Sequence, residues 1–136
     1  MTKILCLDDE PRILGIYEGM FRTMDGVNVV TAANGKEGLA LFETAPEDYG
    51  LILTDYEMPE MDGLEFLRHI RVFEQPPRVM LSGRVDADLQ RRVRTLGAEG
   101  VIAKPFTSEF VRTVAEELLA TGKSGQLITY ITRHYF

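Results

Sequence analysis

Short continuous apolar runs alternate along the chain with longer segments in which apolar residues recur every three or four positions. The runs occupy residues 3–7, 27–31, 51–54, 78–81 and 100–103. Runs this short and continuous are typical of strands buried on both faces of a sheet. The segments between them carry stripes at helical spacing, such as Leu89, Val93 and Leu96. The pattern therefore predicts five strand–helix pairs in succession.

Residues that favour helix starts precede these segments: Pro11, the pair Asn34 and Glu37, Asp62, and Thr107 or Ser108. The third helix is expected to run from Asp62 to about Phe73, and Gly122 is expected to end the fifth. Each connection between strands is long enough for a crossover. The prediction is a single α/β domain over residues 1–120, a doubly wound parallel sheet with helices on both faces.

Composition narrows the class of protein. The 136 residues are 45% hydrophobic and 26% charged, which is typical of a soluble globular chain. The formal charge of −6 argues against direct nucleic-acid binding. The single cysteine, Cys6, lies in an apolar run and is expected to be buried in a reducing compartment. Because we find neither a signal peptide nor an apolar run near the ~18 residues of a membrane span, we expect a cytoplasmic protein without membrane contact.

Polar side chains follow four of the predicted strands: Asp8 and Asp9 the first, Asp55 the third, Ser82 the fourth and Lys104 the fifth. In an open parallel sheet the carboxyl ends of the strands meet at one edge, where ligands bind. Two like charges ~4 Å apart repel by roughly 4 kcal/mol at an effective dielectric of ~20, so the carboxylates should attract a cation. Oxygen ligands without His or Cys favour Mg²⁺.

The other two groups suit a phosphoryl group. Ser82 offers a hydroxyl donor and Lys104 a positive charge. Asp55, at the centre of the cluster, is then the candidate nucleophile that would form an aspartyl phosphate.

These residues lie in recognisable motifs: the acidic pair Asp8–Asp9, LTDYEMPEMDG around Asp55, LSG ending at Gly83, and KPF at 104–106. The chain resembles the receiver domain of response regulators, the phosphoacceptor module of two-component signalling, over residues 3 to about 120. The resemblance implies a flavodoxin-like fold with strand order 2-1-3-4-5, and a signalling domain rather than an enzyme.

The resemblance also implies individual roles. Asp55 would be the phosphorylated residue. Mg²⁺ would be bound by Asp9, Asp55 and the backbone carbonyl of Glu57, with Asp8 acting through a water. Ser82 and Lys104 would contact the phosphoryl group, and the Lys104–Pro105 bond would be cis. The donor would be a sensor histidine kinase or a histidine phosphotransfer protein.

One position departs from the family pattern. Receivers usually carry Tyr or Phe three residues before the lysine, and here that position is Val101. The expected partner face includes Arg84, Arg91 and Arg94, and a homodimer through the fourth helix, fifth strand and fifth helix is a further expectation. The two histidines, His69 and His134, are interpreted as ordinary surface residues.

Residues 121–136 form a tail outside the family pattern. Its apolar residues fit a helix or a strand equally well, and it could pack on its own domain, join a dimer or begin an output domain. The sequence fits two other functions less well. A haloacid-dehalogenase-like phosphatase would need a second Asp where Glu57 stands, and a pseudo-receiver that never takes phosphate is disfavoured by the complete set of pocket residues.

Overall fold

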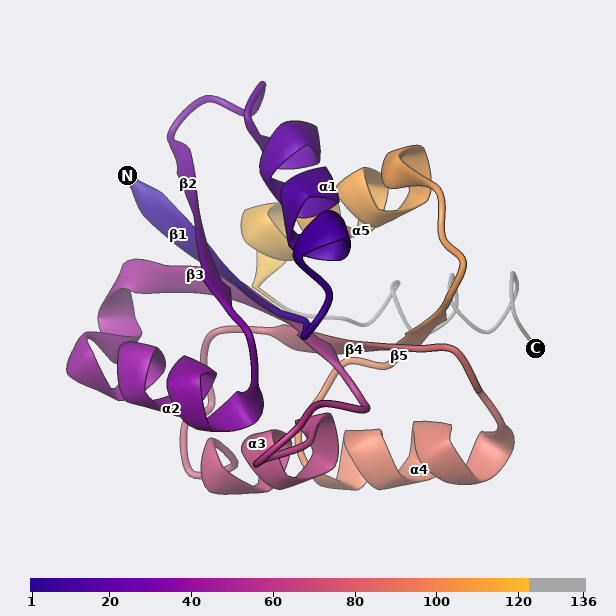
Figure 1. The fold of residues 1–136 in the computed structure, drawn as a ribbon. Helices are drawn as coiled ribbons and strands as arrows, with labels where there is room; N and C mark the ends of the chain where they lie inside the picture. The colour runs from indigo at the N-terminus through magenta and orange to yellow at the C-terminus, as the bar shows by residue number, and fades with distance from the viewer. Residues whose placement is uncertain (123–136) are drawn as a thin grey trace.

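The computed structural model describes residues 1–122, which form a parallel sheet between two layers of helices (Figure 1). The elements are β1 (Thr2–Leu7), α1 (Pro11–Phe21), β2 (Val27–Ala32), α2 (Gly35–Thr44), a 3₁₀ turn η1 (Pro46–Asp48), β3 (Tyr49–Asp55), α3 (Gly63–His69), β4 (Arg78–Ser82), α4 (Ala87–Thr95), β5 (Val101–Ala103) and α5 (Ser108–Thr121).

The strand order is β2-β1-β3-β4-β5, and every pairing is parallel. This confirms the predicted fold class and strand order. Because the strands are parallel and in register, their carboxyl ends share one edge: Asp55 pairs with Leu81, and Ser82 with Ala103. The residues predicted to carry chemistry therefore meet at one side of the sheet.

Helices α1 and α5 cover one face of the sheet, and α2, α3 and α4 cover the other (Figure 1). Each face has its own apolar core. The first contains Cys6 and residues of α1 and α5, and the second contains Val101 and residues of α2, α3 and α4. Cys6 is fully buried as predicted, and burial raises the pKa of its thiol above the ordinary range.

Helix α3 ends at His69, so the expected extension to about Phe73 is wrong. The reason is a buried arginine. The Arg78 guanidinium donates to the carbonyl oxygens of Ile70 at 2.9 Å, Phe73 at 2.7 Å and Pro76 at 3.0 Å. These three bonds hold the chain in an irregular connection between α3 and β4. Burial lowers the pKa of Arg78 to about 10.

The helix caps follow the sequence closely. Asn34 accepts from the Glu37 N–H at 2.8 Å, while the Glu37 carboxylate accepts from the Ala33 N–H rather than from Asn34. Thr107, rather than Ser108, caps α5. Gly122 ends that helix at φ +67°, a left-handed conformation that favours glycine.

No helix among residues 1–122 is long and apolar enough to cross a membrane. The predictions for residues 123–136, including the helix or strand of the tail and the interpretation of His134, lie outside the described residues.

Candidate functional site

Asp55 is the last residue of β3, and its position is fixed by the backbone around it. The strand that carries it is almost entirely buried, and Asp55 itself is only 8% exposed. Its Oδ1 accepts a hydrogen bond from the Tyr56 N–H at 2.9 Å. The carboxylate therefore points from a rigid strand end toward the carboxyl edge of the sheet.

The loop after Asp55 returns to pack against it. The Gly63 N–H donates to the Tyr56 carbonyl oxygen at 2.7 Å, and Asp62 caps α3 by accepting from the Glu65 N–H at 2.9 Å. A Cβ atom at position 63 would overlap the carbonyl oxygen of Asp55. The Asp-Gly pair in this motif is thus needed for the close approach of α3 to the end of β3.

Three carboxylates gather at this edge. One carboxylate oxygen from each of Asp8, Asp9 and Asp55 lies within 4.8 Å of the other two. Asp8 is fully buried at the end of β1, while Asp9 is exposed. The structure therefore brings together the three acids that the sequence placed at separate strand ends.

Lys104 supplies the neighbouring positive charge. Its Nζ lies 2.7 Å from Asp8 Oδ2 and 3.1 Å from Asp55 Oδ1, and the Lys104–Pro105 bond is cis, as the resemblance implied. Burial alone would lower the pKa of Lys104, but its bonds to the two carboxylates outweigh burial and raise the pKa. Burial raises the pKa of Asp55, and the hydrogen bond and charge of Lys104 offset part of that effect.

The oxygen atoms at the pocket fit a hard divalent cation. Both oxygens of Asp8 are engaged, one by the Glu10 N–H and one by Lys104. Within residues 1–122, no hydrogen bond engages the carboxylate of Asp9 or Asp55 Oδ2. Free oxygens on Asp9 and Asp55, beside the fully hydrogen-bonded carboxylate of Asp8, suit Mg²⁺, which binds few protein ligands and keeps several waters.

Ser82 lies at the pocket, but its hydroxyl is turned into the loop that follows β4. Its Oγ donates to the Arg84 carbonyl oxygen at 2.8 Å and lies 3.1 Å from the Arg84 N–H, from which it accepts. To bond a group on Asp55, the hydroxyl must give up its bond to the Arg84 carbonyl. The state of the pocket is therefore linked to the loop that leads into α4.

The pocket opens into a cavity of about 640 Å³ that contains Asp55, Ser82 and Lys104 and extends along α4. Arg84 and Arg92 line it, and Glu57 lies at the same cavity. Arg92 was missed at the sequence level, because helical periodicity alone cannot tell which polar residue of α4 turns toward the sheet edge. Of the predicted partner residues, Arg84, Arg91 and Arg94 are all exposed, and Arg91 pairs with Asp88.

Val101 is fully buried in the α2–α3–α4 core, and its N–H donates to Gln90 Oε1 of α4 at 3.0 Å. Gln90 is only 8% exposed and was also missed, because a glutamine in a helix is usually an exposed residue. His69 is exposed at the end of α3, away from this cluster, in agreement with its interpretation as a surface residue.

The fold and the site together define a doubly wound α/β module with an acidic pocket and a lysine at the carboxyl edge of its sheet. The model of the response regulator receiver domain family matches residues 4–116, and the chain belongs to this family. It is a receiver domain, a signalling domain of two-component systems.

Individual relatives agree with this assignment. The chain is 27% identical to a probable chemotaxis protein CheY from Rhizobium etli, over 89% of this chain and 95% of that protein. It is 34% identical to the transcriptional regulatory protein CpxR of Klebsiella pneumoniae over 78% of this chain, but spans only 44% of that longer regulator. A CheY-like receiver structure from Methanospirillum hungatei matches with a TM-score of 0.81 at 27% identity, over 90% of this chain and 96% of that one.

Proposed function

We propose that Asp55 accepts a phosphoryl group from a phosphohistidine. The observation that carries this proposal is the placement of its carboxylate, at a rigid strand end, 3.1 Å from Lys104 and within an open cavity. An Asp55 oxygen would attack phosphorus. A P–O bond forms as the P–N bond to the imidazole breaks, and its electron pair goes to the imidazole nitrogen.

The proposed metal site comprises Asp9, Asp55 and the backbone carbonyl of Glu57, with Asp8 acting through a water. The free carboxylate oxygens of the first two acids support this assignment, and so does the spacing of the acidic cluster. Bound Mg²⁺ would offset the negative charges that phosphoryl transfer brings together. Asp8 would mainly hold Lys104, whose ammonium it already contacts.

Lys104 and Ser82 would receive the phosphoryl oxygens. Lys104 is within hydrogen-bond distance of Asp55 and carries a charge that persists across neutral pH, because its pKa is raised. Ser82 is the last residue of β4, next to the strand that carries Asp55, but its hydroxyl donates to the Arg84 carbonyl oxygen. If the Ser82 hydroxyl donated its hydrogen bond to a phosphoryl oxygen instead, it would release Arg84 and alter the surface of α4.

That surface is the proposed output. It comprises Arg84, Arg91 and Arg94 and continues across β5 to α5, and it would contact an acidic partner or a second copy of the chain. The donor would be a sensor histidine kinase or histidine phosphotransfer protein, and the receiver, residues 1–120, would act in the cytoplasm without binding nucleic acid. The exposure of the three arginines supports this face.

The two alternative functions are not favoured. A haloacid-dehalogenase-like phosphatase is at odds with the receiver match. A pseudo-receiver is at odds with the acidic cluster and the Lys104 contacts. The proposed activity is therefore limited to phosphorylation of the domain itself and the later hydrolysis of its aspartyl phosphate.

Intact-mass measurement tests the proposal. With acetyl phosphate and Mg²⁺ the chain should gain one phosphoryl group, Asp55→Asn should abolish the gain, and Asp25→Asn should retain it. An unchanged mass with both acetyl phosphate and a phosphohistidine donor would overturn the proposal.

A second experiment tests the output face. Beryllofluoride with Mg²⁺ should change the association state of the chain or the signal of a probe attached within residues 84–112. Saturation without any change there would exclude this face.

A further inference from the structure

Strand β5 lies at the end of the sheet, and helix α4 supplies one of its hydrogen bonds. Beside it lies β4, with Met80 opposite Val101. The Val101 N–H donates to the side chain of Gln90 at 3.0 Å rather than to the backbone of a strand. An amide side chain from α4 therefore satisfies a backbone donor of the edge strand, which would otherwise be unpaired.

The other half of the same amide has no partner. Gln90 Nε2 is buried and has no hydrogen-bond acceptor among the described residues. The amide cannot be turned to relieve this, because its NH₂ group would then face the Val101 N–H. A methionine would fill the same space without the unpaired Nε2, but it would leave the Val101 N–H without an acceptor. Glutamine at position 90 thus bonds α4 to β5 in this state while it carries a buried unpaired donor, and such costs tend to mark functional positions.

A short path connects Gln90 to the phosphorylation pocket. The Ser82 hydroxyl is bonded to the backbone of Arg84. Two residues later, Asp86 caps α4 by accepting from the Leu89 N–H at 2.8 Å. Gln90 is the next residue of the same helix. When Ser82 gives up Arg84, the loop that fixes the start of α4 loses a tether, and Gln90 lies one turn beyond it.

The position of Val101 makes this contact relevant to switching. Valine has no ring that could swing between two positions in response to Ser82. Its side chain is packed with Leu89 and Val93 of α4 in the same core, and its backbone is bonded to Gln90. A movement of α4 relative to β5 must therefore break or rearrange the Gln90 contact.

We propose that Gln90 is a positioning residue that couples the pocket to the α4 surface. Its bond to Val101 holds α4 against β5 in the unphosphorylated chain, and is given up when Ser82 turns to the phosphoryl group. The amide and the Val101 N–H then become available on the α4–β5 face to the backbone of a partner. This inference rests on the proposed phosphorylation of Asp55, and Gln90 would be the residue that links that site to the α4 surface.

Amide hydrogen exchange of the full chain tests the coupling. Beryllofluoride with Mg²⁺ should accelerate exchange at the Val101 N–H by about threefold to tenfold, the range expected for one lost hydrogen bond. Ser82→Ala should abolish that acceleration, because the loop is no longer released by the ligand.

Gln90→Met provides the matching variant. Because the lost bond stabilises only the unphosphorylated state, Gln90→Met should bind beryllofluoride about threefold to tenfold more tightly, with fast Val101 exchange before the ligand is added. Thr95→Ala is the control: it removes an exposed hydroxyl bond within α4 and should match the wild type in both measurements. A purely structural Gln90 would change stability without changing beryllofluoride affinity.

The outcomes are separable. If intact mass shows phosphorylation of Asp55 but Val101 exchange in the wild type is unaffected by beryllofluoride, the Gln90 coupling is wrong and the proposed function stands. Unchanged beryllofluoride affinity in Gln90→Met leads to the same conclusion. If the wild type neither gains a phosphoryl group nor binds beryllofluoride, both proposals fail.

Discussion

Lys104 donates a 2.7 Å hydrogen bond to the buried carboxylate of Asp8. Lys104 follows the last strand, β5, and Asp8 follows the first strand, β1. The ammonium thus partly neutralises the acidic pocket from within. Asp8 is fully buried, so without this contact it would be a carboxylate with only one backbone donor, the Glu10 N–H. The same ammonium reaches Asp55, which links the stability of the pocket to its chemistry.

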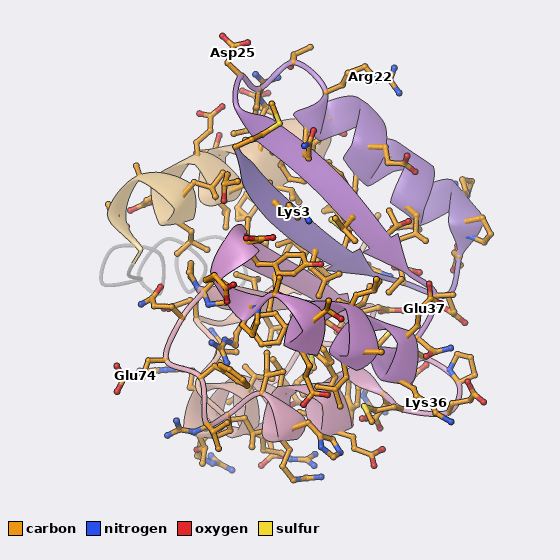
Figure 2. The ribbon with its side chains drawn as sticks, turned by 90° about the vertical axis from the view of Figure 1, so that its left-hand side faces the viewer. Lys3, Arg22, Asp25, Lys36, Glu37 and Glu74 are labelled. Atoms are coloured by element: carbon orange, nitrogen blue, oxygen red, sulfur yellow. The ribbon has the colours of Figure 1, made fainter. Side chains whose placement is uncertain are left out.

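Lys104→Met should destabilise the protein. It leaves Asp8 and Asp55 close together without their cation, and we expect the free energy of unfolding to fall by about 2 kcal/mol in the absence of Mg²⁺. Denaturation by urea, followed by circular dichroism, measures this loss. Mg²⁺ should reduce the difference from the wild type, because a bound cation replaces part of the missing charge. Lys36→Met, at an exposed position on α2 (Figure 2), should cost little. Equal stabilities of Lys104→Met and wild type would refute this account.

Asp55→Asn should become increasingly favourable to stability as pH rises. Burial raises the pKa of Asp55 above its ordinary value of 3.8, so the folded state holds the proton more tightly than the unfolded chain. The stability contributed by that proton is complete below pH 3.8 and is lost as pH rises through the folded-state pKa. The wild type should therefore lose stability relative to Asp55→Asn over that interval. Urea titrations without Mg²⁺ at a series of pH values measure the free energy of unfolding of both proteins. A difference between the two free energies that does not change with pH would contradict the prediction.

Mg²⁺ should stabilise the fold through Asp9. At a concentration tenfold above the dissociation constant, a ligand that binds only the folded state adds about 1.4 kcal/mol. Asp9→Asn should lose most of this gain, and a chelator should reverse it in the wild type. Asp25→Asn is the matched control, because Asp25 is exposed and precedes β2, at the opposite end of the strand from the carboxyl edge that carries the pocket (Figure 2). Thermal unfolding with and without Mg²⁺ measures the effect. Equal Mg²⁺ stabilisation of the two variants would remove Asp9 from the metal site.

Gly63→Ala and Gly19→Ala should have opposite effects. A Cβ at position 63 would overlap the Asp55 carbonyl oxygen, so we expect a loss of about 2 kcal/mol and slower phosphorylation by acetyl phosphate. Gly19 lies within α1, where an added Cβ would meet no atom within 4 Å beyond its chain neighbours and the backbone of its own helix, so alanine should add about 0.5–1 kcal/mol. Urea denaturation and an acetyl phosphate time course test the pair. A Gly63→Ala protein with normal stability and rate would show that the approach of α3 to Asp55 is not needed.

The sequence predicted the sheet and the pocket well because both depend on local pattern. Continuous apolar runs identify buried strands wherever they occur, and a polar residue at the end of each run must emerge at the carboxyl edge of a parallel sheet. Asp8, Asp55, Ser82 and Lys104 were found in this way. Cap residues such as Asn34 and Asp62 were equally readable, because a cap bonds to a backbone N–H three residues along the chain.

The alternation of elements, the edge of the sheet that carries chemistry and the residue types gathered there thus follow from local sequence pattern. The direction of side chains with distant partners depends instead on how the elements pack. Arg78 ends α3 early by binding carbonyl oxygens of the residues that follow it, and Ser82 turns to Arg84 instead of Asp55. Gln90 is buried against Val101. Apolar periodicity indicates which face of an element is buried, whereas a hydrogen bond to another element depends on the packing of the two elements against each other.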